Sequence, residues 1–159
     1  MKVVIVGGVA GGATAAARLR RLDESAEIVV FERSGYVSYA NCGLPYYIGG
    51  IITDRAELTL QTPESFWRRF RVDMRVRHEV TAIHPDTKTV DVKNLATGEV
   101  FAESYDKLIL SPGARPTQPA LPGVGIDRLF TLRTVEDTLK LREFIEQHHP
   151  CLLYTSDAA

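Results

Sequence analysis

Cys42 is the residue of this chain best suited to chemistry. It lies in the run Ser-Tyr-Ala-Asn-Cys-Gly-Leu-Pro, and the second cysteine, Cys151, is far away near the C-terminus. The Gly-Leu-Pro that follows is typical of a helix start, and a helix N-terminus favours the ionised, nucleophilic form of a thiol. A buried structural cysteine is the alternative. The polar neighbours Ser38 and Asn41 favour a redox-active thiol.

A glycine-rich loop lies upstream of Cys42, between a β-branched run and an alanine-rich run. Its bare N–H groups and the helix start behind it favour a bound pyrophosphate. Glu32 ends the next apolar run and is placed to accept hydrogen bonds from a ribose diol. The spacing predicts a dinucleotide site in a βαβ unit; the alternative is a tight turn that packs a helix on a sheet. The loop consists of Gly7, Gly8, Val9, Ala10, Gly11 and Gly12.

Three polar residues share one face of the helix that follows the loop. Thr14, Arg18 and Arg21 stand at positions i, i+4 and i+7. Two guanidinium groups there could hold a phosphorylated ligand. From the spacing alone, however, a solvated basic face is the simpler interpretation.

The elements that must position these residues form an α/β pattern. Buried strands are expected over residues 2–7, 27–32, 72–76 and 107–110. Helices are expected over 11–22, from near Cys42, over 63–70 with Thr62 as N-cap, and over 134–149 with Thr134 and Asp137 at its start. The rest of 33–62 is expected to be irregular. A β-meander is predicted over 79–84, 89–94 and 100–105.

Composition sets the broad class. The chain has 159 residues and a net charge of −1, so nothing in its bulk charge predicts binding to nucleic acid or to an anionic membrane. No run approaches the length of a membrane span, and no export signal is recognisable. Two cysteines in such a chain predict a cytoplasmic setting. No metal-ligand pattern is recognised.

The chain is expected to comprise two parts. Residues 1–150 read as one domain with a proline-rich linker at about 115–123. Residues 151–159 share no pattern with what precedes them, and we interpret them as a non-native tail, such as a translated sequencing adapter would add.

The loop at the start of the chain, the meander, and the later strand with Ser-Pro-Gly-Ala-Arg-Pro together resemble the pyridine nucleotide–disulfide oxidoreductases. The resemblance spans residues 1–150. It implies a Rossmann-like FAD-binding domain with an inserted β-meander, whose doubly wound sheet is incomplete here. It also implies FAD as cofactor, NAD(P)H as co-substrate, and a homodimeric parent protein.

Within that family the segment 38–49 resembles the single-cysteine subgroup. Paired-cysteine members carry a second cysteine five positions on, where this chain has Tyr47. Oxidase and peroxidase members typically have a histidine in the glycine loop, where this chain has Ala10. The loop is instead similar to that of coenzyme A disulfide reductases, including versions fused to a rhodanese domain.

The resemblance implies a role for each matched position. Cys42 would be catalytic and would form a mixed disulfide with coenzyme A. The coenzyme would be held by Thr14, Arg18, Arg21, Ser38 and Asn41, although the family often has glutamine at the position of Arg18. Besides the glycine loop, FAD would contact Glu32, Arg33, Val80, Ser111, Pro112, Gly113 and Arg115.

The implied reaction passes a hydride from NAD(P)H to the flavin and then electrons to the Cys42–S–S–CoA disulfide, so that coenzyme A disulfide or persulfide is reduced. Rival interpretations are an NADH oxidase, peroxidase or polysulfide reductase, and a non-catalytic nucleotide-binding module. Since no second glycine-rich strand–loop–helix follows, we expect the chain to be an N-terminal fragment that is inactive alone.

Overall fold

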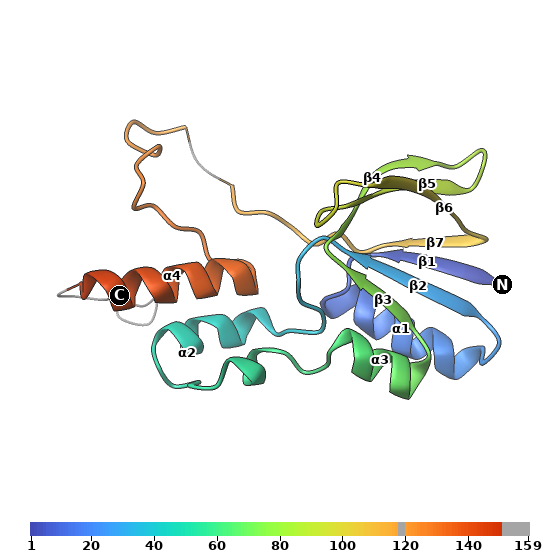
Figure 1. Cartoon of the computed structure of the whole chain (residues 1–159), viewed down its shortest axis with the longest axis horizontal. Helices are drawn as coiled ribbons and strands as arrows, with labels where there is room; N and C mark the ends of the chain where they lie inside the picture. The colour runs from blue at the N-terminus through green and yellow to red at the C-terminus, as the bar shows by residue number, and fades with distance from the viewer. Residues whose placement is uncertain (118–119, 151–159) are drawn as a thin grey trace.

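A four-stranded parallel sheet is the centre of the computed structural model, which describes residues 1–117 and 120–150 (Figure 1). The strand order is β3-β2-β1-β7, and each neighbouring pair is parallel. Parallel strands are apolar along both sides because both faces of such a sheet are covered. The strands are β1 (Lys2–Val6), β2 (Glu27–Glu32), β3 (Asp73–Val76) and β7 (Lys107–Leu110).

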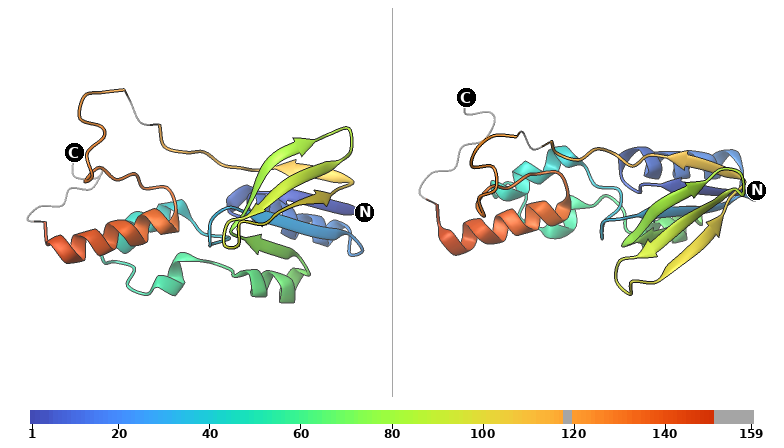
Figure 2. Two further views of the ribbon diagram at one scale, coloured as in Figure 1. Left: turned by 45° about the horizontal axis from the view of Figure 1, so that its top comes forward. Right: turned by 90° about the horizontal axis from the view of Figure 1, so that it is seen from above.

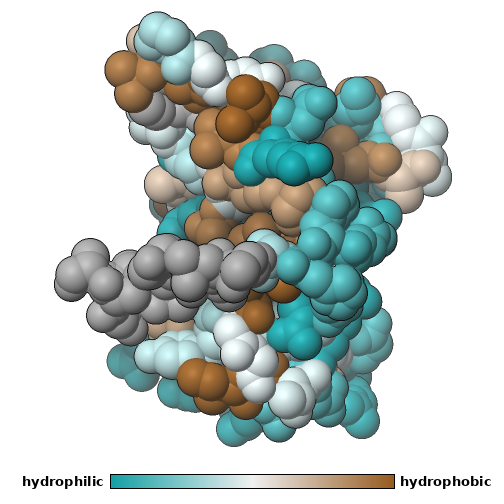
Figure 3. All heavy atoms as spheres, turned by 90° about the vertical axis from the view of Figure 1, so that its left-hand side faces the viewer, coloured by the Kyte–Doolittle hydropathy of each residue, from teal (hydrophilic) through white to brown (hydrophobic). Residues whose placement is uncertain are grey.

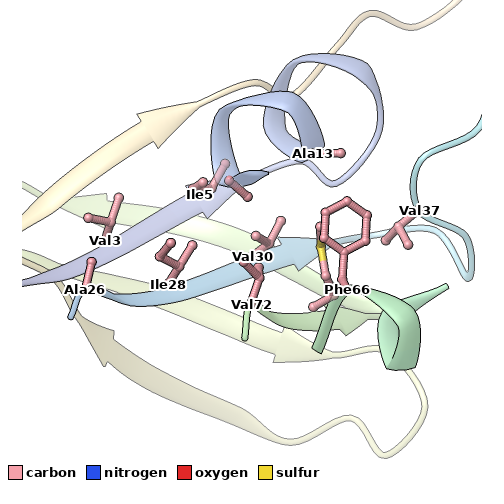
Figure 4. Packing of buried hydrophobic residues seen from close by; sticks show 11 residues of the cluster. Val3, Ile5, Ala13, Ala26, Ile28, Val30, Val37, Phe66 and Val72 are labelled. Atoms are coloured by element: carbon pink, nitrogen blue, oxygen red, sulfur yellow. The ribbon is translucent and has the colours of Figure 1, made fainter. Parts of the chain in front are cut away.

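Two helices cover one face of this sheet, α1 (Ala10–Leu22) and α3 (Pro63–Phe70). Alternate strand residues point toward them, and Figure 4 shows this side of the core between the strands and the helices. Small residues of α1, such as Ala16, let the helix lie close to the sheet. Phe66 of α3 closes the cluster at the other helix. The buried strand residues on this side are Val3, Ile5, Ile28, Val30 and Met74.

An antiparallel meander covers the opposite face. It consists of β4 (His78–His84), β5 (Thr89–Asn94) and β6 (Val100–Ser104) in that order. The intervening strand residues, among them Val29 and Phe31, pack here against Val90 and Val92. The described core is therefore three layers deep: helices, parallel sheet and meander (Figure 2).

Ion pairs tie the meander to the parallel sheet. The Glu103 carboxylate of β6 forms salt bridges with Lys2 Nζ of β1 at 2.6 Å and with Arg75 Nη1 of β3 at 2.9 Å. Its side chain is only 12% exposed. One carboxylate therefore links three strands from two sheets.

A smaller group of elements lies away from the sheet, at the left of Figure 1. It contains a 3₁₀ turn (Asn41–Gly43), helix α2 (Leu44–Ile48), a second 3₁₀ turn (Arg55–Leu58) and helix α4 (Val135–His148). Leu44, Leu58 and Val135 share an apolar cluster there with Tyr39. Figure 3 looks onto this end, where hydrophobic and hydrophilic surface alternate. Ile51, which follows α2, is 75% exposed.

The expected elements are confirmed with small shifts at their ends. Thr62 and Thr134 cap α3 and α4, and each helix start has the reciprocal hydrogen bonds of a capping box. The 33–62 region is less irregular than expected, because it adds the Arg55–Leu58 turn and a bridge between Tyr39 and Thr59. In the expected linker, the described residues form no helix or strand. The predicted non-native tail, 151–159, lies outside the described residues. None of the described helices has the length and apolar character needed to cross a membrane.

Candidate cofactor and substrate site

The glycine loop lies where the carboxyl ends of β1 and β7 meet, the usual ligand edge of a doubly wound sheet. Backbone hydrogen bonds hold it there: Gly7 N donates to Phe31 O at 2.8 Å, and Ser111 N donates to Val6 O at 2.8 Å. The two predicted cofactor segments, 7–12 and 111–115, are therefore neighbours although about a hundred residues separate them.

Close backbone approaches explain why glycine is needed in this loop. A Cβ atom on Gly7 would collide with the Ser111 carbonyl, and Gly7 also has a φ of +97°. A Cβ atom on Gly12 would collide with the carbonyl of Gly7. The loop is thus folded tightly against β7 and against the first turn of α1.

The start of α1 is open to an anion. Its N-cap residue, Val9, contributes no side-chain hydrogen bond, and the first turn contains no acidic residue. The first N–H groups of a helix have no partners inside the helix, so they are available to an outside acceptor such as a phosphate. Ala10 and Gly11 in this turn are exposed.

Glu32 connects the loop to the end of β2. Its Oε2 accepts a hydrogen bond from Gly8 N at 2.7 Å, and its Oε1 accepts one from Ser34 N at 2.8 Å. The residue is 9% exposed. A carboxylate has about four acceptor positions, so two remain for a hydroxyl pair of a ribose.

Two adjoining cavities border Glu32. The loop cavity, about 380 Å³, lies between the glycine loop, the end of β7 and the start of α4. The meander cavity, about 290 Å³, lies between β7 and β4. Both are lined by Glu32, Arg33, Pro112, Gly113 and Ala114, so together they form one extended site. An extended dinucleotide fits this shape better than a compact ligand.

Tyr39 brings a phenol to the loop cavity and is 7% exposed. Burial raises the pKa of Tyr39 to about 12, and the negative charge of Glu32 acts in the same direction. The raised pKa keeps the hydroxyl protonated well into the alkaline range, so it can act as a hydrogen-bond donor toward the cavity.

A third cavity, the arginine cavity, lies between α1 and α3 and measures about 430 Å³. Three guanidinium-bearing residues line it, and Phe66 and Phe70 form its apolar side. The structure thus brings together four of the five residues predicted to bind coenzyme A. Its polar lining is Thr14, Arg18, Arg21, Ser38, Gln61 and Arg69.

The segment that leads to Cys42 runs between the loop cavity and the arginine cavity. Ser38 has a φ of +51°, and its N donates to Gly8 O at 3.0 Å while its O accepts from Leu60 N at 2.9 Å. Ser38 lines the arginine cavity, whereas Tyr39 and Asn41, which follow it, line the loop cavity. Cys42 follows in the 3₁₀ turn and is exposed.

Most predicted cofactor residues line the extended site. Val80 and Arg115 border the meander cavity. Asn41, which was predicted to bind coenzyme A, lies instead at the loop cavity, apart from the other four residues. Among the described residues no group of three or more His, Cys, Asp or Glu side chains could hold a metal ion.

Several further residues line these cavities without having been predicted from the sequence. Tyr39, Arg133 and Glu136 line the loop cavity, and His78 lines the meander cavity. Arg69 carried a local signal, since it lies on an arginine-rich helix. Arg133 and Glu136 carried none, because only the packing of α4 brings them to the loop.

These features fit a bound FAD. The glycine cradle and the open start of α1 suit its pyrophosphate, and the free acceptor positions of Glu32 suit its ribose. The backbone of 7–12 would contact the diphosphate, and the meander cavity would take the adenosine.

Comparison with known proteins agrees with this geometry. The family model described as pyridine nucleotide-disulphide oxidoreductase matches residues 1–149. A coenzyme A disulfide reductase of Staphylococcus haemolyticus is 47% identical over 147 residues, covering 92% of this chain and 33% of that protein. The chain thus spans about a third of the length of the curated relatives it matches.

Two solved structures share the fold. Reduced CoADR-RHD of Bacillus anthracis has a TM-score of 0.91 and 53% identity, over 94% of this chain and 27% of that one. The NAD-dependent persulfide reductase of A. fulgidus has a TM-score of 0.87 and 34% identity, over 93% of this chain and 28% of that one. The chain therefore belongs to the pyridine nucleotide-disulphide oxidoreductases, a family of enzymes that use FAD and NAD(P)H.

Proposed function

We propose that this chain is the FAD-binding and substrate-binding part of an NAD(P)H-dependent oxidoreductase that reduces coenzyme A disulfide, or coenzyme A persulfide, through Cys42. The activity is proposed for a protein of the relatives' length. The 159-residue chain alone is expected not to turn over, because its sequence contains a single glycine-rich strand–loop–helix.

The course of residues 38–42 is the observation that carries the proposal. This segment separates a cavity suited to a cofactor from a cavity lined by Arg18, Arg21 and Arg69, and it ends at an exposed thiol. Coenzyme A is a phosphorylated thiol, so guanidinium groups would hold its anionic part while its sulfur reaches Cys42.

The proposed reaction at Cys42 has two steps. The thiolate attacks coenzyme A disulfide, a Cys42–S–S–CoA bond forms, and one coenzyme A thiolate leaves. Two electrons reduce that mixed disulfide, which releases the second thiolate and restores Cys42. FAD, when bound, supplies the two-electron transfer from NAD(P)H to a disulfide. With a persulfide the same attack would release hydrosulfide.

The first step can be tested on the chain itself. In a Cys151→Ser background, Cys42 is the single thiol, and coenzyme A disulfide is expected to modify it faster than the neutral hydroxyethyl disulfide does. Mass spectrometry would follow the adduct, and dithiothreitol should remove it. Replacing Arg18 and Arg69 with glutamine removes two positive charges and should lower the ratio of the two modification rates about 10-fold. Raised salt should lower this ratio as well. A wild-type ratio near one would contradict the proposed substrate.

Turnover can be tested in a chimera. Residues 1–150 would replace the matching segment of the Staphylococcus haemolyticus reductase, and NADH and NADPH oxidation would be measured with coenzyme A disulfide, polysulfide, oxygen and peroxide. We expect coenzyme A disulfide to be preferred and Cys42→Ser to abolish its reduction. A Cys42→Ser chimera that kept the disulfide reductase rate would exclude Cys42 as the redox centre.

A further inference from the structure

We propose that Arg142 of α4 is a positioning residue for Cys42, because it anchors the short helix that follows the thiol. The inference rests on the proposed function of Cys42 and extends it to a residue a hundred positions away. No local pattern in the sequence links these two residues.

Helix α2 cannot be stable by itself. It has five residues, whereas isolated helices in water need roughly a dozen or more. The 3₁₀ turn that contains Cys42 runs directly into α2 at Leu44. The position of the thiol therefore depends on what holds α2 in place.

Helix α4 holds α2 at both ends, and the two helices lie side by side in Figure 1. At the start of α2, Leu44 is 1% exposed and shares an apolar cluster with Val135, with Leu139 packed against it. At the end of α2, Arg142 Nη1 donates to the carbonyl of Tyr47 at 2.9 Å and to that of Ile48 at 3.2 Å.

The Arg142 guanidinium suits this task. The last carbonyls of a helix lack partners inside the helix, and a planar cation can serve two of them at once. The group also lies over the Tyr47 ring, 5.8 Å from its centre. Its Nε donates to Glu146 Oε1 at 2.6 Å on the solvent side, away from the contact with α2. Through these contacts, the single side chain of Arg142 holds the C-terminal end of α2.

The test compares Arg142→Gln with a matched control, Glu146→Gln, in the Cys151→Ser chain. Glu146 touches Arg142, but in the described part of the chain it makes no hydrogen bond to α2, and its side chain is 60% exposed. The readouts are the ratio of Cys42 exchange rates with coenzyme A disulfide and hydroxyethyl disulfide, and the ¹⁹F spectrum of a trifluoroethyl label on Cys42.

For Arg142→Gln we expect the exchange ratio to fall about 5-fold and the label to shift toward its position in the unfolded chain, while the Glu146 variant stays near wild type. Arg142→Lys should recover part of both, because an ammonium can also donate to these carbonyls but lacks the planar group that lies over the Tyr47 ring. The unfolding midpoint of the whole chain should change little, since the three-layer core is untouched.

The outcomes separate the two proposals. A wild-type ratio near one would contradict the proposed substrate, and the ¹⁹F label would still decide the role of Arg142. An unchanged label and an unchanged ratio in Arg142→Gln would overturn the positioning role. A loss of overall stability without a change at Cys42 would also overturn it, because that is the result of a merely structural contact.

Discussion

Tyr39 illustrates how a single residue takes its properties from its surroundings. Three residues before Cys42, it faces the loop cavity and also belongs to the apolar cluster beneath α2. Its burial favours the neutral phenol, which explains the raised pKa. The loop cavity therefore has both a hydrogen-bond donor, the Tyr39 hydroxyl, and a hydrogen-bond acceptor, the Glu32 carboxylate.

The raised pKa makes the stability of the fold depend on alkaline pH. A group whose pKa is higher in the folded state stabilises the fold below its unfolded pKa of about 10, and that contribution is lost as the pH rises through about 12. Tyr39→Phe removes this dependence. Denaturant unfolding at pH 8 and pH 11 should show wild type losing about 1.4 kcal/mol relative to the variant, because pH 11 lies one unit above the unfolded pKa. If the free energy of unfolding changed equally with pH in wild type and in Tyr39→Phe, this role of Tyr39 would be contradicted.

At the scale of elements, the meander is attached to the parallel sheet by one carboxylate as well as by apolar packing. Glu103 accepts from Lys2 and Arg75, and its hydrogen bond is the main cause of the raised pKa of Lys2. Since the meander forms one wall of the meander cavity, this attachment also supports the cofactor site.

Glu103→Gln should destabilise the chain by about 1–3 kcal/mol, because two cations lose a nearly buried partner. Glu27→Gln is the matched control: it removes the other partner of Lys2, but that carboxylate is 61% exposed and should contribute under about 1 kcal/mol. Equal losses in the two variants, measured by urea unfolding, would show that burial of Glu103 is unimportant.

At the scale of the whole molecule, the extended site proposed for FAD joins parts that are distant in sequence. The glycine loop, β7, the meander and the start of α4 all contribute to it. A ligand that bridges these parts should stabilise the entire fold, since it binds the folded chain alone.

FAD is therefore expected to raise the thermal midpoint of the chain. At a concentration 100-fold above its dissociation constant, the gain would be about 2.7 kcal/mol, or roughly 5–10 °C for a domain of this size. Gly11→Val should abolish the shift, because its side chain would meet the Ser111 hydroxyl and intrude on the loop cavity. A wild-type chain that FAD does not stabilise would show that these cavities are insufficient for binding.

The sequence alone determined the parts of this protein that depend on local physics. The apolar runs specified the strands, the capping residues Thr62 and Thr134 specified two helix starts, and the glycines of the loop specified a close backbone approach. These signals lie within a few residues of one another, so they can be read along the chain.

Only the tertiary structure decided which residues share a cavity. It placed Arg69 beside Arg18 and Arg21, separated Asn41 from them, and brought Arg133 to the glycine loop. It also set α4 against α2, so that Arg142 contacts carbonyls 94 and 95 positions away. Such contacts follow from the packing of distant elements, and neither periodicity nor spacing within a segment contains that information.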